Sequence, residues 1–193
     1  MNYNPRTLSQ RRCQRRASRG FSLVELLAVV TISTILAVAG VAMFRRHITA
    51  SRGSEATSIL EAMRAAQGMY MAENHGYLNA SSTNGSAAWY PLLIPNTTRS
   101  AWRNPNHNDW GKWQLLPMPL NKTVMFGYLC NAGVPNTAMT KLALDFKSPP
   151  TLPVPQLDWY VLQAKGDTNG DGTFALYATT SLTNEIYIEN EGE

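Results

Sequence analysis

The chain has 193 residues, with 17 Lys and Arg against 13 Asp and Glu, and a formal net charge of +4. Six of the basic residues lie within the first 19 positions, which contain no acid, so the chain from Gly20 onward carries 11 basic and 13 acidic side chains, a formal charge of −2. The high isoelectric point is therefore no argument for a nucleic-acid-binding domain, which needs a basic face on its folded part. The length leaves room for one soluble domain of ordinary size, about 130–150 residues.

An apolar run of 24 residues from Phe21 to Phe44 contains one charged residue, Glu25. As a helix it would be roughly 36 Å long, enough to cross a hydrocarbon core of about 30 Å. The segment before the run is basic and contains these arginines: Arg6, Arg11, Arg12, Arg15, Arg16 and Arg19. This arrangement predicts a membrane-spanning segment whose basic start stays in the cytoplasm, with the rest of the chain exported.

Glu25 is the unusual residue of the run. A carboxylate costs about 2.5–3.5 kcal/mol at the centre of a bilayer and less near the headgroups. Either Glu25 lies close enough to the interface to stay hydrated, or it has a partner and a function.

The stretch Gly20-Phe21-Ser22-Leu23-Val24-Glu25-Leu26-Leu27 resembles the processing site of type IV prepilins and of the pseudopilins of type II secretion. The resemblance implies that prepilin peptidase cleaves between Gly20 and Phe21 and methylates the new amine of Phe21. It also implies that Glu25 pairs with the N-terminal ammonium of a neighbouring subunit during assembly. Two opposite charges that are each costly in lipid are tolerable as a pair. The resemblance covers residues 15–75.

The resemblance implies an α+β pilin fold, in which a long N-terminal helix packs on a C-terminal antiparallel sheet. On this plan we expect four parts in the chain: a cleaved leader (1–20), a transmembrane part of the helix (21–44), its amphipathic continuation (45–75) and a globular head (76–193). Within the head we expect a variable loop region (76–156) and a C-terminal meander that carries an acidic loop (157–193).

The amphipathic continuation is visible in the sequence itself. Its apolar residues recur at the four- and three-residue spacing of a helical stripe: Ile59, Met63, Ala66 and Tyr70. Charged residues fall largely off this stripe: Glu55, Glu61, Arg64 and Glu73. The sequence Asn74-His75-Gly76 predicts the end of the helix, with Gly76 as the residue after the cap. Gly53 should weaken the helix by about 1 kcal/mol relative to Ala.

The region from 76 to 156 is interrupted by prolines and holds four of the five tryptophans: Trp89, Trp102, Trp110 and Trp113. These rings belong either to the core or to a contact surface of a filament or adhesin. Residues 122–130 read as a strand, and 148–155 as extended chain. Cys13 lies in the leader, so Cys130 has no partner for an intrachain disulfide and is either a small buried residue or a reactive thiol.

Three apolar segments near the end of the chain, 159–164, 173–180 and 185–189, predict an antiparallel meander that covers the helix. We expect Cys130 to leave this region without a disulfide, so another device must hold it in place.

An acidic loop lies between the first two of these segments. Asp167, Asn169 and Asp171 are spaced as hard oxygen ligands for Ca²⁺, with the carbonyl of Thr173 as a fourth ligand. The twelfth position is Ala178, where an EF-hand needs Glu, so the missing carboxylate would have to come from elsewhere, and Asp158 and Glu185 are the candidates. The alternative is a hairpin turn whose side chains bond their own backbone. Calcium is the one cofactor that the sequence suggests.

No catalytic signature accompanies these features: neither H-E-x-x-H nor G-x-S-x-G occurs, and an enzyme is not expected. The resemblance implies a structural pilus subunit, and the tryptophan-rich middle and the lack of proline in the membrane run favour a minor pilin involved in pilus assembly, adhesion or motility. A major pilin and a type II secretion pseudopilin are the close alternatives. A membrane-anchored periplasmic binding domain with an uncleaved helix is an alternative from another class.

The implied partners are prepilin peptidase, other pilin subunits and the inner-membrane pilus assembly platform, with no nucleic acid. The implied location is the bacterial inner membrane, as a single-pass protein with a cytoplasmic N-terminus, and then the cell-surface pilus.

Overall fold

The structure, a computed structural model, describes residues 20–83, 88–93, 96–118, 121–139, 146–147 and 149–191, with the backbone alone at residues 42, 45, 46, 49 and 50. The chain divides into two compact units between Ala42 and Met43, and each is described by itself. The expected leader, apart from Gly20, lies outside the described residues.

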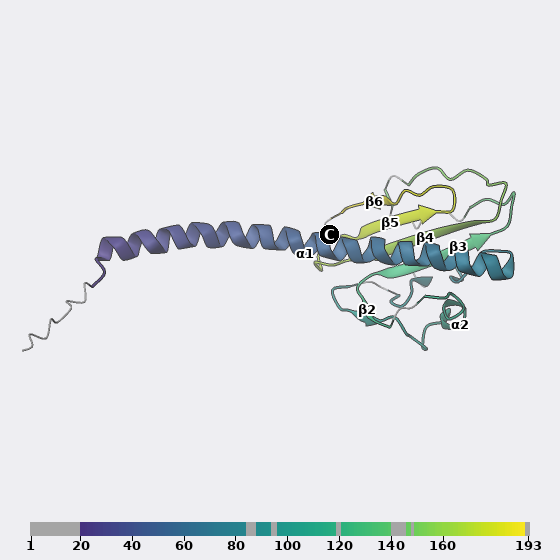
Figure 1. Cartoon of the computed structure of the whole chain (residues 1–193), viewed down its shortest axis with the longest axis horizontal. Helices are drawn as coiled ribbons and strands as arrows, with labels where there is room; N and C mark the ends of the chain where they lie inside the picture. Colours follow the sequence, from purple (N-terminus) through teal and green to yellow (C-terminus); the bar gives the residue numbers. More distant parts are fainter. Residues whose placement is uncertain are drawn as a thin grey trace, which may run out of the picture. The chain divides into compact units, whose positions relative to one another are not determined.

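A single helix, α1 (Leu23–Asn74), contains 52 residues, so the expected long N-terminal helix is confirmed (Figure 1). Its first 19 residues, Leu23–Val41, are long and apolar enough to cross a membrane. In the second unit three residues of the predicted stripe, Ile59, Met63 and Ala66, are at most 1% exposed, and the fourth, Tyr70, is partly buried.

The end of α1 differs from the expectation. His75, and not Gly76, adopts the left-handed conformation, with φ of 57°. The His75 N–H still bonds the carbonyl of Met71 at 2.9 Å, so the last helical hydrogen bond and the left-handed turn fall on the same residue. Histidine is among the residues that tolerate this conformation.

The main sheet has four antiparallel strands in the order β3-β4-β5-β6. They are β3 (Gly127–Gly133), β4 (Trp159–Gly166), β5 (Ala175–Thr180) and β6 (Tyr187–Glu189). The order in space follows the order in the chain, so the meander is confirmed, and with α1 it establishes the α+β class.

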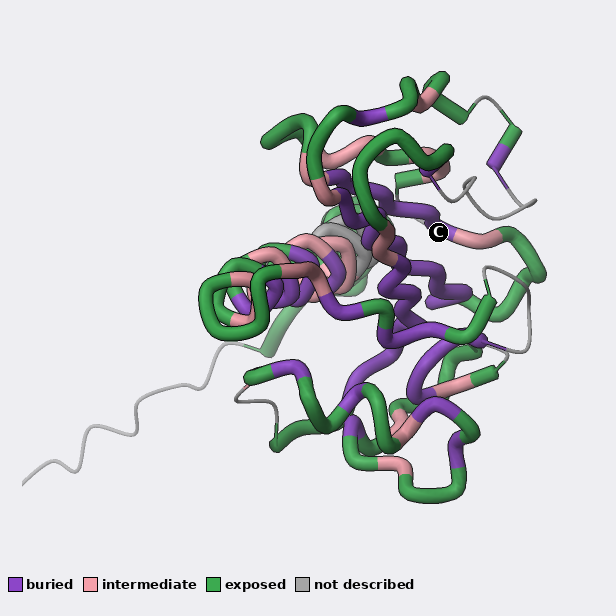
Figure 2. Tube along the Cα trace, turned by 90° about the vertical axis from the view of Figure 1, so that its right-hand side faces the viewer, coloured by how far each residue is buried: buried purple, intermediate pink, exposed green. Residues whose placement is uncertain are grey.

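The strands β3, β4 and β5 are largely buried, and Figure 2 shows buried residues in purple through the middle of the head, whereas β6 is more exposed. Along β3, β4 and β5 the side chains alternate between two apolar clusters. Tyr128, Cys130 and Leu162 pack with the helix stripe in one cluster. Leu129 and Val161 belong to a second cluster on the opposite face, which includes Trp89, Phe146 and Trp159. The sequence predicted the layer formed by the helix but not the outer layer.

A smaller lobe holds β1 (Ser100–Ala101) and β2 (Thr123–Val124), which pair antiparallel, and the short helix α2 (Trp110–Trp113). The strand predicted over 122–130 is therefore wrong in part, because β2 pairs with β1 whereas β3 pairs with β4. The chain leaves the first pairing at Met125, whose N–H donates to a Glu55 carboxylate oxygen at 2.8 Å instead of to a strand.

The tryptophans are core residues for the most part. Trp102 and Trp113 are buried in the cluster that includes the helix stripe, with Trp110 partly buried against it, and Trp89 is buried in the second cluster. Cys130 is fully buried, which agrees with a structural thiol.

Candidate functional site

The segment around the expected processing site forms the start of α1. Gly20 and Phe21 precede the helix and are exposed. Ser22 caps the helix: its hydroxyl accepts the Glu25 N–H at 3.2 Å, and its carbonyl accepts the Leu26 N–H at 3.1 Å. Ser22 and Glu25 have the S-x-x-E spacing of a capping box. The S-x-x-E pattern is visible in the sequence, but the sequence-based prediction of the site did not include it.

Glu25 lies in the first turn of α1. Its carboxylate has no hydrogen-bond or ion-pair partner among the described residues. The amino end of a helix carries a partial positive charge, which favours an anion in this turn. The unpartnered carboxylate is thus held one helical turn beyond Phe21, at the end of an apolar surface.

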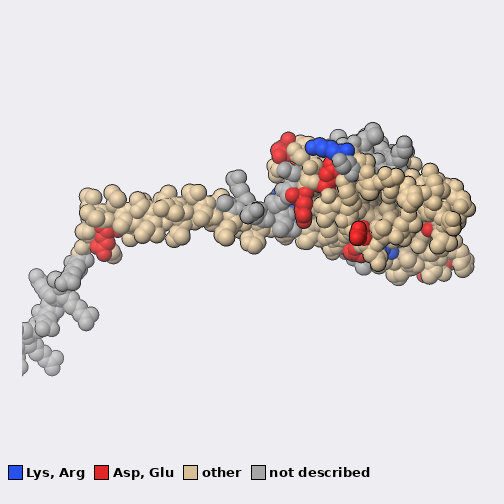
Figure 3. All heavy atoms as spheres, turned by 90° about the horizontal axis from the view of Figure 1, so that it is seen from above, with Lys and Arg blue, Asp and Glu red and all other residues tan. Residues whose placement is uncertain are grey.

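That surface is continuous along the first unit. The stretch of α1 from Leu26 to Val41 contains no charged residue, and on the face that Figure 3 shows it is tan throughout its described atoms. The two threonines within it are satisfied internally, since the Thr31 hydroxyl donates to the Ala28 carbonyl at 2.9 Å and the Thr34 hydroxyl donates to the Val30 carbonyl at 2.7 Å. A helix with this surface meets the requirement that hydrocarbon places on polar groups.

The acidic loop joins β4 to β5. Both carboxylate oxygens of Asp167 accept backbone N–H groups, from Gly170 at 2.6 Å and from Gly172 at 3.1 Å. The Asn169 side-chain oxygen accepts the Asp171 N–H at 2.9 Å, and an Asp171 oxygen accepts the Thr173 N–H at 2.7 Å. These contacts are the ones that the turn alternative predicts. The calcium hypothesis for Asp167, Asn169, Asp171 and Thr173 stays a prediction.

The two candidates for a further calcium ligand are misplaced. Asp158 precedes β4 and Glu185 follows β5, so both lie at the end of the sheet opposite the acidic loop. The eight residues of β4 separate these ends by roughly 25 Å. The expectation that Asp158 or Glu185 completes a calcium site is therefore wrong. Among the described residues, no group of three or more His, Cys, Asp or Glu side chains is placed to hold a metal.

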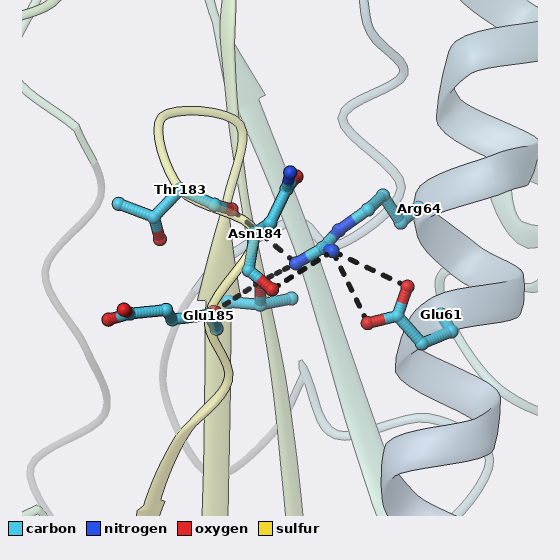
Figure 4. A network of polar contacts seen from close by, with 6 residues as sticks. Glu61, Arg64, Thr183, Asn184 and Glu185 are labelled. Carbon is cyan, nitrogen blue, oxygen red and sulfur yellow. Dashed lines mark hydrogen bonds and ion pairs between the residues drawn. The ribbon is translucent and has the colours of Figure 1, made fainter.

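Arg64 connects α1 to the turn between β5 and β6 (Figure 4). Its guanidinium donates to the Thr179 hydroxyl, to the Asn184 carbonyl at 3.3 Å and to the Thr183 carbonyl at 3.5 Å. It also forms an ion pair with Glu61 at 3.3 Å. The Arg64 side chain is only 18% exposed, so a residue that lies off the predicted apolar stripe is nonetheless packed against the sheet. A guanidinium that faces the sheet can replace apolar contact with hydrogen bonds.

Cys130 belongs to a second polar contact of α1. The Gln67 side-chain amide donates to the Leu78 carbonyl at 2.7 Å and lies 2.8 Å from the Cys130 sulfur. The Gln67 oxygen accepts the Leu78 N–H at 2.9 Å. Burial raises the pKa of the Cys130 thiol to about 12. The thiol therefore stays protonated and unreactive at neutral pH.

Residues 15–41 match the family model of the prokaryotic N-terminal methylation motif. Comparison with curated proteins finds no match, and comparison with solved structures finds none either. The matched residues include the expected processing site at Gly20 and Phe21, the cap at Ser22, Glu25 and the apolar part of α1.

Proposed function

As a chain that carries the signature of the type IV pilins and pseudopilins at residues 15–41, this protein is, we propose, a structural subunit of a type IV pilus that joins the filament through α1. Within that family we propose the role of a minor pilin, which takes part in pilus assembly, adhesion or motility. The single observation that supports a filament role most strongly is the continuity of the motif with the exposed apolar first part of α1, Leu23–Val41.

We propose that prepilin peptidase cleaves between Gly20 and Phe21 and methylates the amine of Phe21. Both residues are exposed and precede the helix, so the bond is not held within helical hydrogen bonds. Cleavage would leave an ammonium at Phe21, beside the positive end of the α1 dipole, where a cation is disfavoured. The ammonium of an incoming subunit and the unpartnered Glu25 carboxylate would then neutralise each other within lipid.

The minor-pilin role is supported by the head. Its irregular, tryptophan-rich lobe is held on the sheet by packed rings, such as Trp102 of the lobe against Tyr128 of β3, with ring centroids 5.6 Å apart. A major pilin and a type II secretion pseudopilin are the alternatives within the family. We propose that the protein passes from the inner membrane, with its head exported, to the assembly platform and then to the pilus.

The first experiment is mass spectrometry of the protein purified from cells that express prepilin peptidase. The proposal expects a mature chain that begins at methylated Phe21. A chain that retains Met1 to Gly20 would instead favour the anchored periplasmic domain. The abundance of the subunit in sheared filaments then separates a minor pilin from a major one.

The second experiment tests the role of Glu25. Glu25→Ala and Glu25→Gln should both reduce incorporation into sheared filaments by at least tenfold, because each leaves the incoming ammonium without its partner. Ser33→Ala is the matched control, since it changes a polar residue of the same apolar segment without removing a charge. Normal incorporation of Glu25→Ala would exclude the pairing role and leave the cleavage proposal intact.

A further inference from the structure

The small lobe contains a cleft of about 420 Å³. Its walls include three indole rings and three polar side chains: Trp102, Trp110, Trp113, Arg103, Gln114 and Asn121. The volume lies within the range of sites that bind small molecules, about 300–1,000 Å³. Polar and aromatic groups thus meet in one concave surface that the filament role does not use.

The aromatic wall is an ordered stack. The Tyr90 ring stacks on Trp113 at an interplanar angle of 16° and lies nearly parallel to Trp110, at 15°, with centroids 6.3 Å apart. Trp102 meets both Tyr90 and Trp113 edge-on. Trp110 and Trp113 are three residues apart on α2 and so share one face of that helix. Trp110 is only partly buried, and it gives the cleft an accessible ring surface.

Hydrogen bonds fix the segments that carry these rings. The Tyr90 hydroxyl donates to the Trp102 carbonyl, and the Asn104 side-chain amide donates to the Pro91 carbonyl at 2.9 Å. A ring nitrogen of His107 lies 3.0 Å from the Trp89 carbonyl. These hydrogen bonds join Trp102, Asn104 and His107 to residues 89–91. The cleft therefore does not depend on a ligand for its shape.

The polar wall carries one positive charge. The Arg103 guanidinium carbon lies 6.0 Å from the centre of the Trp110 ring. No carboxylate lines the cleft among the described residues, and the nearby Asp109 is buried with its carboxylate bonded to Ser82. Gln114 and Asn121 offer amide donors and acceptors in the same wall.

We propose that this cleft binds an acidic sugar residue, a uronate unit of an extracellular polysaccharide. The apolar face of the sugar ring stacks on Trp110, where burial of C–H groups against an indole gives most of the affinity. The sugar carboxylate pairs with the planar guanidinium of Arg103, and the ring hydroxyls bond Gln114 and Asn121. This binding activity goes beyond the filament role and does not depend on it.

The single positive charge of the cleft favours a uronate over a nucleic acid. A single-stranded nucleic acid is bound by a groove with cations along the phosphate backbone. In the cleft only Arg103 is cationic among the described lining residues, and Lys112 lies on α2 away from the face that Trp110 and Trp113 share. One guanidinium suits one carboxylate.

The experiment uses the full chain in a detergent without a sugar headgroup. The probes are a tetramer of galacturonate and the same tetramer with its carboxylates methyl-esterified, which differ in charge and share the ring. Binding is followed by saturation-transfer NMR on the sugar and by tryptophan fluorescence. We expect the acidic tetramer to bind at least tenfold more tightly than the ester, and Arg103→Gln to abolish this preference.

Two variants complete the test. Trp110→Ala should weaken both tetramers at least tenfold, whereas the matched control Lys112→Met, on the other face of α2, should leave both affinities unchanged. Because the ratio of acidic to esterified binding is measured on one protein sample, loss of folding cannot imitate the effect of Arg103→Gln. The proposal is overturned if neither tetramer binds at millimolar concentration, if Lys112→Met acts like Arg103→Gln, or if single-stranded DNA binds the cleft more tightly than the sugar.

Discussion

The contact between Arg64 and the β5–β6 turn should contribute measurably to the stability of the head. In Arg64→Met the apolar stem is kept and the guanidinium is lost. A hydrogen bond from a charged donor contributes about 1.5–3 kcal/mol when well formed. The bond to the Thr179 hydroxyl is close, whereas those to the Asn184 and Thr183 carbonyls, at 3.3 and 3.5 Å, are long and weaker. The sum is a loss of about 2 kcal/mol in the free energy of unfolding.

Urea unfolding of the full chain in detergent measures this loss. All five tryptophans lie between 89 and 159, so their fluorescence reports the head and not the apolar segment. A loss of about 2 kcal/mol should lower Tm by about 4–8 °C for a domain of this size. Hydrogen exchange should also become faster in the turn at 181–186.

Glu61→Gln is the matched control for this prediction. The Glu61 side chain is 52% exposed, and an exposed pair of this kind contributes less than about 1 kcal/mol. Arg64→Lys keeps the charge but not the planar fork, so its stability should lie between those of the wild type and Arg64→Met. An Arg64→Met variant within about 0.5 kcal/mol of the wild type, or one matched by Glu61→Gln, would refute the role assigned to the guanidinium.

Three further predictions concern stability. Folding raises the pKa of the Cys130 thiol from 9.0 to about 12, so between these pH values the folded chain keeps a proton that the unfolded chain loses. The free energy of unfolding should therefore fall by up to about 1.4 kcal/mol per pH unit above pH 9. Cys130→Ala should reduce the slope of the urea midpoint against pH. Asp167→Ala should lower the free energy of unfolding by about 1–3 kcal/mol in calcium-free buffer, because two loop amides lose their acceptor. Thermal melts of the wild type with added calcium then distinguish the two readings of the loop: a metal site raises Tm with calcium, and a turn does not. Gly133→Ala should cost about 1–3 kcal/mol, because its Cβ would lie 2.3 Å from the Trp159 ring, whereas Gly111→Ala, which meets no neighbour, should not destabilise the head in urea titrations.

Much of the fold follows from local patterns. The uninterrupted apolar run and the stripe at 59–70 predict α1 because helical periodicity is recorded in adjacent residues. The three C-terminal segments predict β4, β5 and β6 because the pattern of a strand is also recorded in adjacent residues. Since short connections join these strands, strands that follow one another in the sequence lie side by side in the sheet. The processing motif is likewise contiguous, which is why the sequence alone identifies it.

No local sequence pattern predicts the polar contacts of α1. Periodicity assigns charged residues to the solvent side, yet Glu55 accepts the Met125 N–H and pairs with Arg99 at 2.8 Å. The partners of Glu55 are 70 and 44 residues away in the chain, so no spacing rule predicts them. The aromatic lobe is a similar case: the sequence shows that tryptophans are frequent there, but the cleft exists only once Tyr90 stacks between distant segments.

These long-range contacts explain how the head, which contains Cys130 as its one cysteine, is held together without an internal disulfide. Arg52 donates to the Thr168 carbonyl in the loop before β5, and Arg64 holds the turn after it. The two arginines are 12 residues apart, or about 18 Å along a helix, and the six residues of β5 span about 20 Å. They therefore bind to α1 the β4–β5 loop at one end of β5 and the β5–β6 turn at its other end.

Between these arginines the strand lies close against the helix. A Cβ at Gly53 would come within 2.8 Å of the Tyr177 hydroxyl, so the glycine that weakens α1 locally is what admits the strand. A disulfide would fix one point of the sheet and would need an oxidising compartment to form. Two guanidinium contacts and one close approach fix a whole strand and are complete as soon as the chain folds, so reducing agents should leave the stability of the head unchanged.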